Sequence, residues 1–304
     1  MRLVSSVAMA LLAVTVAAAQ PEAVEVHHIH GLAFDRREPG ALLVATHTGL
    51  VRIRLGANPE WVGASRFDLM GFTVSSADRG MLYASGHPDL LTYRREGHGI
   101  LGLLLSRDGG RTWEGVALKG QTDFHALTYS PDGGGELFGW SVAGQTGLHR
   151  ISTKTWAAQR LAAHGVRDVL ALAASHDLPS RLVAGTPGGL LLSQDRGVTW
   201  RSVAGIPRDV PVTAVAYSPT ERRRVYAYVV RAGYGLMRSD DAGATWRPTG
   251  LAAKPDEAVV AIAIAPGPAS KVAAATTAAS VFVSDDGGRS WRPVLDRGRV
   301  PTTR

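Results

Sequence analysis

Six of the seven tryptophans recur at a nearly constant spacing, and this periodicity constrains the fold more than any other feature of the chain. Successive members of the series lie 52, 43, 44, 46 and 45 residues apart. A repeat of about 40 to 50 residues that contains several short strands is typical of a β-propeller blade. The sequence therefore predicts six blades, marked by Trp61, Trp113, Trp156, Trp200, Trp246 and Trp291.

In four of the six units the tryptophan ends one motif, Ser-x-Asp-x-Gly-x-Thr/Ser-Trp. The central Asp and Gly suit a tight turn, because Gly accepts a positive φ and Asp accepts hydrogen bonds from nearby backbone N–H groups. Strand-forming residues flank the motif on both sides. It therefore predicts a hairpin whose tryptophan fills the gap between neighbouring blades. The four copies are Ser106–Trp113, Ser193–Trp200, Ser239–Trp246 and Ser284–Trp291.

This motif resembles the Asp-box (BNR repeat) of sialidase-type and sortilin-type β-propellers, in which it is a structural hairpin. The resemblance implies an all-β fold, a single six-bladed propeller over residues 24–295, with the boxes between the third and fourth strands of each blade. Three further motifs resemble a group of secreted bacterial proteins labelled glycosyl-hydrolase-like: His28–Gly31, Ser85–Pro88 and Asp123–His125. That label rests on the repeat, so it implies fold more than activity.

The two ends of the chain lie outside the predicted propeller. Residues 1–19 have a basic start, an apolar centre and an Ala-x-Ala sequence before Gln20, which predicts a secretory signal peptide and a secreted or periplasmic location. No later apolar run approaches the length of a membrane span. The absence of cysteine excludes disulfides and a lipid-anchored lipoprotein. Residues 296–304 form a basic C-terminal tail.

The net charge of +7 does not indicate a nucleic-acid-binding protein. The arginines are scattered through predicted loops and outer strands, with no stripe of interleaved arginines and aromatics. We expect a monomer with a small-molecule, glycan or metal ligand, and a protein partner stays open as an alternative.

Aligning the six units with one another locates the inner strand of each blade. The second position of the aligned segments is always Gly or Ala, as expected where inner strands crowd near the axis. The segments are His30–Phe34, Met70–Val74, His125–Tyr129, Leu170–Ala174, Thr213–Tyr217 and Val260–Ile264.

Polar residues gather before the inner strands of only some blades. Two positions before each segment, and on the same strand face if side chains alternate, the units carry His28, Asp68, Asp123, Asp168, Pro211 and Ala258. Blades 1 to 3 thus combine imidazole, carboxylate and thioether groups, whereas blades 5 and 6 carry none. Repetition alone does not require such one-sidedness.

The loops after the second strands add two more histidines, His47 and His87. In an up-and-down blade these loops emerge on the same face as the starts of the inner strands. An insertion in blade 2, at about residues 86–99 and including His98, lies on that face too. The sequence predicts that four histidines share one metal ion, His30, His47, His87 and His125. It places His28, Asp68 and Asp123 in the adjoining shell and Met70 at the edge.

Three kinds of function remain open at this point. Imidazole and carboxylate ligands suit a transition metal, copper or zinc, and the thioether favours copper. A polar pocket with a His/Asp acid–base pair is the rival interpretation. A glycoside hydrolase needs two facing carboxylates, for which Asp68, Asp123 and Asp168 are candidates. The arginine triad and Tyr/Glu pair of standard sialidases do not map onto the aligned positions. A protein-interaction scaffold, resembling sortilin's ectodomain or photosystem assembly factors, ranks below the metal or polar-ligand site and the glycoside hydrolase.

Overall fold

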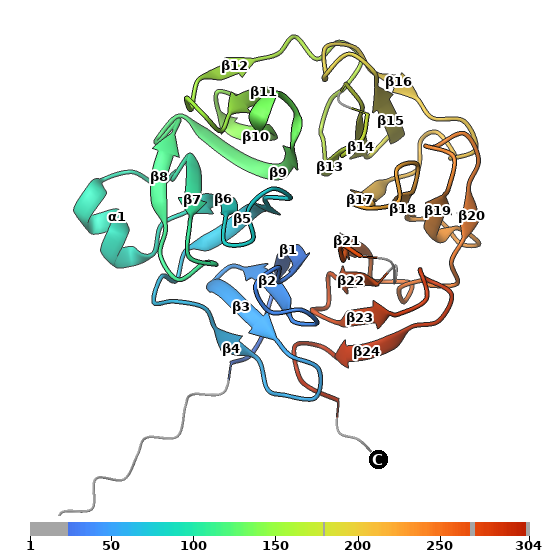
Figure 1. Ribbon diagram of the computed structural model, residues 1–304, viewed down its shortest axis with the longest axis horizontal. Coiled ribbons are helices and arrows are strands. Elements are labelled where there is room, and N and C mark those ends of the chain that lie inside the picture. The colour runs from blue at the N-terminus through green and yellow to red at the C-terminus, as the bar shows by residue number, and fades with distance from the viewer. Residues whose placement is uncertain (1–23, 179, 268–270, 302–304) are drawn as a thin grey trace, which may run out of the picture.

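The structure, a computed structural model, describes residues 24–178, 180–267 and 271–301. These residues form six four-stranded antiparallel sheets arranged in a ring, each built from one continuous stretch of chain (Figure 1). The predicted six-bladed β-propeller is confirmed. The predicted signal peptide, residues 1–19, lies outside the described residues. In the described part of the chain, no helix is both long and apolar enough to cross a membrane.

Each blade runs outward from the channel in chain order. Blade 1 contains β1 (Ile29–Phe34), β2 (Leu42–Thr46), β3 (Gly49–Ile53) and β4 (Glu60–Trp61). Blade 2 contains β5 (Asp68–Val74), β6 (Leu82–His87), β7 (Leu103–Ser106) and β8 (Glu114–Ala117). Blade 3 contains β9 (Thr122–Ser130), β10 (Glu136–Gly144), β11 (Gly147–Ser152) and β12 (Ala158–Arg160).

The second half of the ring repeats this plan. Blade 4 contains β13 (Ala171–Ala174), β14 (Leu182–Thr186), β15 (Gly189–Ser193) and β16 (Arg201–Ser202). Blade 5 contains β17 (Val212–Tyr217), β18 (Val225–Val229), β19 (Gly235–Ser239) and β20 (Arg247–Pro248). Blade 6 contains β21 (Val259–Ile264), β22 (Val272–Thr276), β23 (Val281–Ser284) and β24 (Arg292–Leu295).

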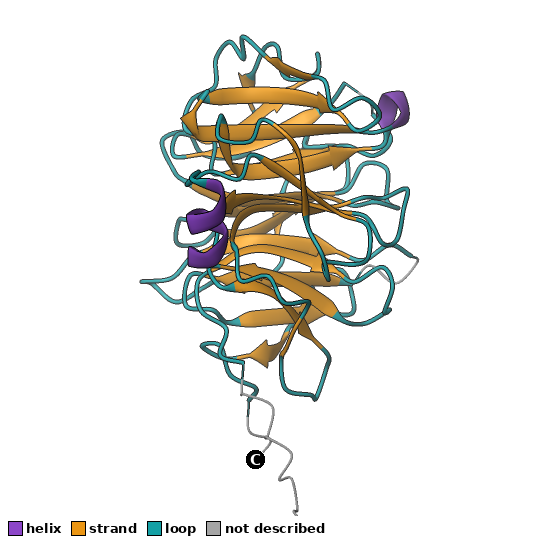
Figure 2. Cartoon of the chain, turned by 90° about the vertical axis from the view of Figure 1, so that its left-hand side faces the viewer, coloured by secondary structure: helices purple, strands orange, loops and turns teal. Residues whose placement is uncertain are grey.

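Two short helical segments mark the two faces of the disc. The helix α1 (Leu90–Glu96) interrupts the connection between β6 and β7, and the 3-10 turn η1 (Asp132–Gly134) connects β9 to β10. They lie on opposite sides of the disc in Figure 2. The face that carries α1, here called the mouth face, is therefore the face of the second-to-third-strand connections and of the inner-strand starts. The blade 2 insertion forms α1 on this face, as the repeat length predicts.

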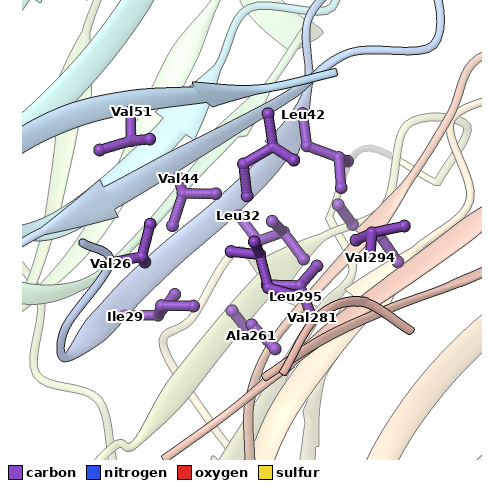
Figure 3. Close-up of a cluster of buried hydrophobic side chains, with 14 of the residues drawn as sticks. Val26, Ile29, Leu32, Leu42, Val44, Val51, Ala261, Val281, Val294 and Leu295 are labelled. Atoms are coloured by element: carbon purple, nitrogen blue, oxygen red, sulfur yellow. The ribbon is translucent and has the colours of Figure 1, made fainter. Parts of the chain in front are cut away.

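The hydrophobic core lies between blades rather than within them. Six clusters of buried aliphatic and aromatic side chains occupy the six interfaces, and Figure 3 shows the one that closes the ring between blades 6 and 1. Each repeat tryptophan packs in the interface between its own blade and the preceding one, including the two from units that lack the full motif. The predicted inter-blade position is confirmed for Trp61, Trp113, Trp156, Trp200, Trp246 and Trp291.

The Ser-x-Asp-x-Gly-x-Thr/Ser-Trp segments are hairpins between the third and fourth strands, as expected. In blade 4 the Asp195 carboxylate accepts hydrogen bonds from the backbone N–H of Val198 (3.1 Å) and Thr199 (2.9 Å) and from the hydroxyls of Thr199 (2.5 Å) and Ser193 (2.8 Å). The Trp200 indole donates to Gly197 O at 3.0 Å. Asp108, Asp241 and Asp286 accept equivalent bonds in their own hairpins.

Small residues at the second inner-strand position allow the inner strands to crowd around the axis. A Cβ added to Gly71 would lie 2.4 Å from Phe124 O of the next blade, which is too close for any side chain. The predicted crowding of the inner strands is therefore observed at Gly71.

The first residues of the predicted basic tail belong to the packed domain. Val26 N donates to Gly298 O at 3.5 Å, Gly298 N donates to Ala279 O, and Val300 packs on the cluster between blades 6 and 1. These contacts join the two ends of the propeller where the ring closes.

Candidate functional site

A β-bulge at the start of the inner strands sets the direction of the site residues. In blade 1, Ile29 pairs with Thr46 and Gly31 with Ala45, so His30 is an extra residue opposite no partner. Met70, His125, Thr213 and Val260 occupy the same bulge in their blades. A bulge interrupts the alternation of side chains and re-aims the extra residue. Even so, residues two positions apart lie together in two blades: His28 and His30 both approach the His47 ring, and His125 Nε2 lies 3.0 Å from Asp123 Oδ2.

Asp68 lies at the centre of the site. It pairs across the sheet with His87, and its carboxylate reaches three imidazoles. Its Oδ1 lies 2.8 Å from His47 Nδ1 and 3.9 Å from His30 Nε2, and its Oδ2 lies 3.2 Å from His87 Nδ1. Gly86 permits this approach, because at φ +145° a Cβ there would lie 1.9 Å from Asp68 O.

Three of these side chains offer ligand atoms to one point. One donor atom each from His30, His47 and Asp68 lies within 4.8 Å of the other two, and the His30 and His47 ring centroids are 4.3 Å apart in an edge-to-face arrangement. His30 Nε2 and Asp68 Oδ1 are both buried; His30 Nε2 has no hydrogen-bond partner, and Asp68 Oδ1 has the 2.8 Å ion-pair contact with His47 Nδ1. An imidazole nitrogen without a partner thus faces a carboxylate oxygen 3.9 Å away at the mouth of the channel.

Burial and neighbouring charges keep the His30 ring neutral. Burial, reinforced by the electrostatic interaction with the neighbouring His47 ring, lowers the pKa of His30 to about 4, although Asp68 opposes this effect. At neutral pH the His30 imidazole is therefore uncharged and can act as an electron-pair donor. A neutral imidazole is the form of histidine that binds metals.

A second carboxylate extends the cluster toward blade 3. Asp123 Oδ2 lies 3.3 Å from His87 Nε2 and 3.0 Å from His125 Nε2, so His87 connects the two carboxylates. Burial opposes the charged form of Asp123, but its contacts with His125 and His87 hold the pKa of this carboxyl below its usual range. Asp123 Oδ1 is buried and has no hydrogen-bond partner. Ser141 Oγ accepts the Asp123 N–H at 3.0 Å and fixes the backbone here.

The structure brings the predicted histidines together on one sector, but not all at equal range. His87 ends strand β6 rather than lying in the following loop, and it joins the His30–His47–Asp68 group through Asp68. His125 joins through Asp123. Binding of a single ion by all four histidines stays a prediction.

The other predicted residues lie at the margin. His28 is exposed, has a φ of +48°, and its ring centroid is 5.0 Å from that of His47. Met70 is half-buried at its bulge. Asp168 is exposed, with a φ of +50°, and precedes β13. Within the described residues, no hydrogen bond or ion pair joins Asp168 to the cluster. His98 lies beyond α1, beside Gly120.

The inner strands of all six blades line a central channel of about 280 Å³. His30 and His125 border it at the mouth face, and Arg36 and His176 border it at the opposite end. Its middle is lined mainly by Ala, Leu, Val and Ile side chains. The polar chemistry of the channel is therefore concentrated at its ends.

Sequence reasoning missed a polar recess beside this cluster. Asp256, Glu257 and Arg297 line it together with His27 and His28. The inner-strand alignment compared one position per blade, and in blade 6 that position is an alanine next to Glu257. A comparison of every residue before the inner strands would have identified Asp256 and Glu257 as charged residues at the start of blade 6.

The comparisons with known proteins support the fold. No protein-family model matches the chain, and no curated protein matches its sequence. Among solved structures, the chain is similar to the GH74 xyloglucanase from Xanthomonas campestris, with a TM-score of 0.57, 20% identity, and coverage of 90% of this chain and 46% of that one. The chain is also similar to the GH74 enzyme of Niastella koreensis, with a TM-score of 0.62 and 16% identity, over 90% of this chain and 46% of that one.

A third similar structure is YCF48 bound to D1 peptide, with a TM-score of 0.51 and 16% identity over 92% of this chain and 86% of that one. The chain spans less than half the length of the two GH74 proteins. At these identities the comparisons establish a propeller fold shared with GH74 and YCF48 proteins.

Proposed function

We propose that the chain is an exported β-propeller of the Asp-box type that binds a transition metal, copper or zinc, at the mouth of its channel. His30, His47 and Asp68 would provide the ligand atoms. The observation that carries the proposal is the convergence of three donor atoms on one point, where the buried His30 Nε2 faces Asp68 Oδ1 and has no hydrogen-bond partner. A buried polar atom without a partner costs roughly 1–3 kcal/mol. A cation would satisfy both atoms at once.

The spacing of the three donors suits such an ion. Bonds of about 2.0–2.1 Å in a tetrahedral site place neighbouring ligand atoms about 3.3 Å apart. The Asp68 Oδ1 distances to His47 Nδ1 and His30 Nε2, 2.8 and 3.9 Å, lie on either side of this value. Two imidazoles and a carboxylate leave a fourth position for water or another ligand, as in many catalytic zinc sites.

The remaining residues of the cluster would orient the ligands. His87 Nδ1 contacts Asp68 Oδ2, and the other ring nitrogen of His87, Nε2, contacts Asp123 Oδ2. Such outer contacts fix the position and basicity of a ligating group, and their loss lowers metal affinity about 10- to 100-fold in characterised proteins. His87 therefore acts through Asp68 in this proposal.

Metal content and titration test the proposal directly. Mass spectrometry of the purified protein should detect copper or zinc, and titration of the metal-free protein should saturate at one ion. His30→Ala, His47→Ala and Asp68→Asn should each lower the affinity by more than His87→Ala does, and the expected loss for His87→Ala is about 10- to 100-fold.

Asp168→Ala is the matched control. It removes a carboxylate at the same strand-start position in blade 4, but an exposed one. The metal affinity of Asp168→Ala should equal that of the wild type. A wild-type protein that binds neither metal, or variants that all bind as tightly as the control, would overturn the proposal.

Glycan binding or hydrolysis is the second candidate, and it is favoured by the fold shared with the GH74 enzymes. Here Asp68 and Asp123 would act on a sugar at the same mouth. Incubation of the protein with xyloglucan oligosaccharides, with and without added metal, tests this function. Cleavage that persists without metal and is lost in Asp123→Asn would favour the glycosidase.

A further inference from the structure

The recess beside the metal-site cluster lies where the ring closes, on the mouth face. It borders the cluster through His28, whose ring centroid lies 5.0 Å from that of His47. Blade 1 contributes the residues before its inner strand, and blade 6 contributes its strand start, one loop and the segment after β24. The recess is lined by His27, His28, Asp256, Glu257, Thr277, Ala278, Ala279 and Arg297.

A buried carboxylate oxygen without a hydrogen-bond partner lies at this recess. The Glu257 side chain is only 8% exposed, and its Oε1 atom is buried and accepts no hydrogen bond. The nearest cation, Arg297 Nη2, is 3.8 Å from Oε1, beyond hydrogen-bond distance. A buried carboxylate is stable when it accepts hydrogen bonds from a cation. Glu257 therefore has unused capacity for a positively charged donor.

The backbone around Glu257 is held in place. Glu257 N donates to Lys254 O at 2.9 Å and closes a turn. The next residue, Ala258, donates its N–H to the Thr277 hydroxyl at 3.2 Å and accepts the Thr277 N–H at 2.9 Å. The wall that carries Glu257 is thus tied to the loop between β22 and β23 and does not depend on a ligand for its shape.

The other charged groups at the recess give it a net negative character. Asp256 is exposed at the rim next to Glu257. His27 Nε2 lies 3.2 Å from a carboxylate outside the recess, that of Glu25, which also binds Arg299. Two carboxylates therefore face a single guanidinium, that of Arg297, in a chain whose net charge is +7.

We propose that this recess binds a small organic cation through its primary ammonium group, with Glu257 as the main acceptor and Asp256 as the second. An ammonium group donates three hydrogen bonds of about 2.7–2.9 Å to acceptors on different sides. A chelated metal ion instead requires three closely spaced donors. The His30–His47–Asp68 cluster is the one group of described residues with that spacing, and it includes no residue of the recess.

Arg297 is a built-in competitor in this arrangement. Its side chain is 64% exposed, and it approaches Glu257 without a hydrogen bond. A bound ammonium group would displace it into solvent at little cost. Removal of the guanidinium should therefore strengthen ligand binding, whereas a purely structural Glu257–Arg297 pair gives no such effect.

Titration of the full-length protein with ethanolammonium tests the proposal. Calorimetry at neutral pH and low salt should show one site, weakened by added salt. Glu257→Gln should lower the affinity by about tenfold or more, which corresponds to the loss of one charge-assisted hydrogen bond, and Asp256→Asn by less. Arg297→Ala should raise the affinity for ethanolammonium. Asp285→Asn is the control, because that carboxylate already pairs with Lys271 and Arg292.

Three results would overturn the proposal: no binding by the wild type and by Arg297→Ala, binding unchanged in Glu257→Gln, or equal binding of neutral ethylene glycol. Thermal unfolding of each variant verifies that it is folded. His47→Ala separates the two sites, because it should lower the metal affinity by more than His87→Ala does and leave ethanolammonium binding unchanged. The proposal for the recess can thus be refuted while the proposal for the metal site is supported, and the reverse.

Discussion

Replacement of Asp195 by alanine tests whether the repeated motif stabilises the fold as the structure indicates. The carboxylate accepts two backbone N–H groups, those of Val198 and Thr199, and the hydroxyls of Thr199 and Ser193. Alanine leaves all these donors without their acceptor. Because the turn is largely exposed, water can replace part of each bond.

The expected cost follows from the number of bonds. A net intramolecular hydrogen bond contributes about 0.5–1.5 kcal/mol, and bonds to a charged group contribute more. With solvent replacing part of four such bonds, we expect Asp195→Ala to lower the free energy of unfolding by about 1–3 kcal/mol. For a domain of roughly this size, the midpoint temperature falls by about 2–4 °C per kcal/mol.

Two variants serve as controls in urea and thermal unfolding followed by tryptophan fluorescence. Asn58→Ala alters the eroded unit of blade 1 at an exposed position, and its effect should stay within about 0.5 kcal/mol. Asp195→Asn keeps one acceptor oxygen and should lie between the two. Equal losses for Asp195→Ala and Asn58→Ala would refute the role assigned to the hairpin.

Three further predictions concern the inner strands, the pH dependence and processing. Gly71→Ala should cost more than about 2 kcal/mol, because its Cβ would lie 2.4 Å from Phe124 O, whereas Gly99→Ala, with open space around it, should change urea unfolding little. The pKa of His30 is about 4 in the folded protein and 6.5 in the unfolded chain. Its contribution to the free energy of unfolding is therefore complete above pH 6.5 and is lost as the pH falls toward 4. His30→Gln should therefore flatten the stability–pH profile over that window, and an unchanged slope would contradict the assignment. Intact-mass measurement of the exported protein should show cleavage after Ala19.

The fold was predictable from the sequence because the repeat encodes it six times. The tryptophan spacing determines the number of blades, and the four full motifs locate the hairpins. The two eroded units could be placed by their period alone, and Trp61 and Trp156 pack at the same inter-blade position as the others. Each interface needs a large apolar side chain at this point, whether or not the turn before it keeps its Asp and Gly.

The site was predictable in its location but not in its detailed arrangement. Consecutive blades place strand starts and second-to-third-strand loops on one face, so His30, His47, His87 and His125 had to lie on one sector. Which side chain lies at the centre depends on the cross-strand register and on individual side-chain contacts, which a sequence pattern does not reveal. Asp68 pairs with His87 beside the close approach at Gly86, and it is this carboxylate, rather than a histidine, that contacts three imidazoles.

The same limitation explains why Glu257 was missed. Self-alignment finds residues that occupy equivalent slots, and it is informative where blades differ at one slot. Glu257 lies one position before the compared slot, and Arg297, from the segment that follows the last strand, lies 3.8 Å from its carboxylate. Its environment arises from ring closure, a contact between the two ends of the chain that occurs once in the molecule. A repeat analysis describes what the blades share, and the chemistry at the closure must be read from the structure.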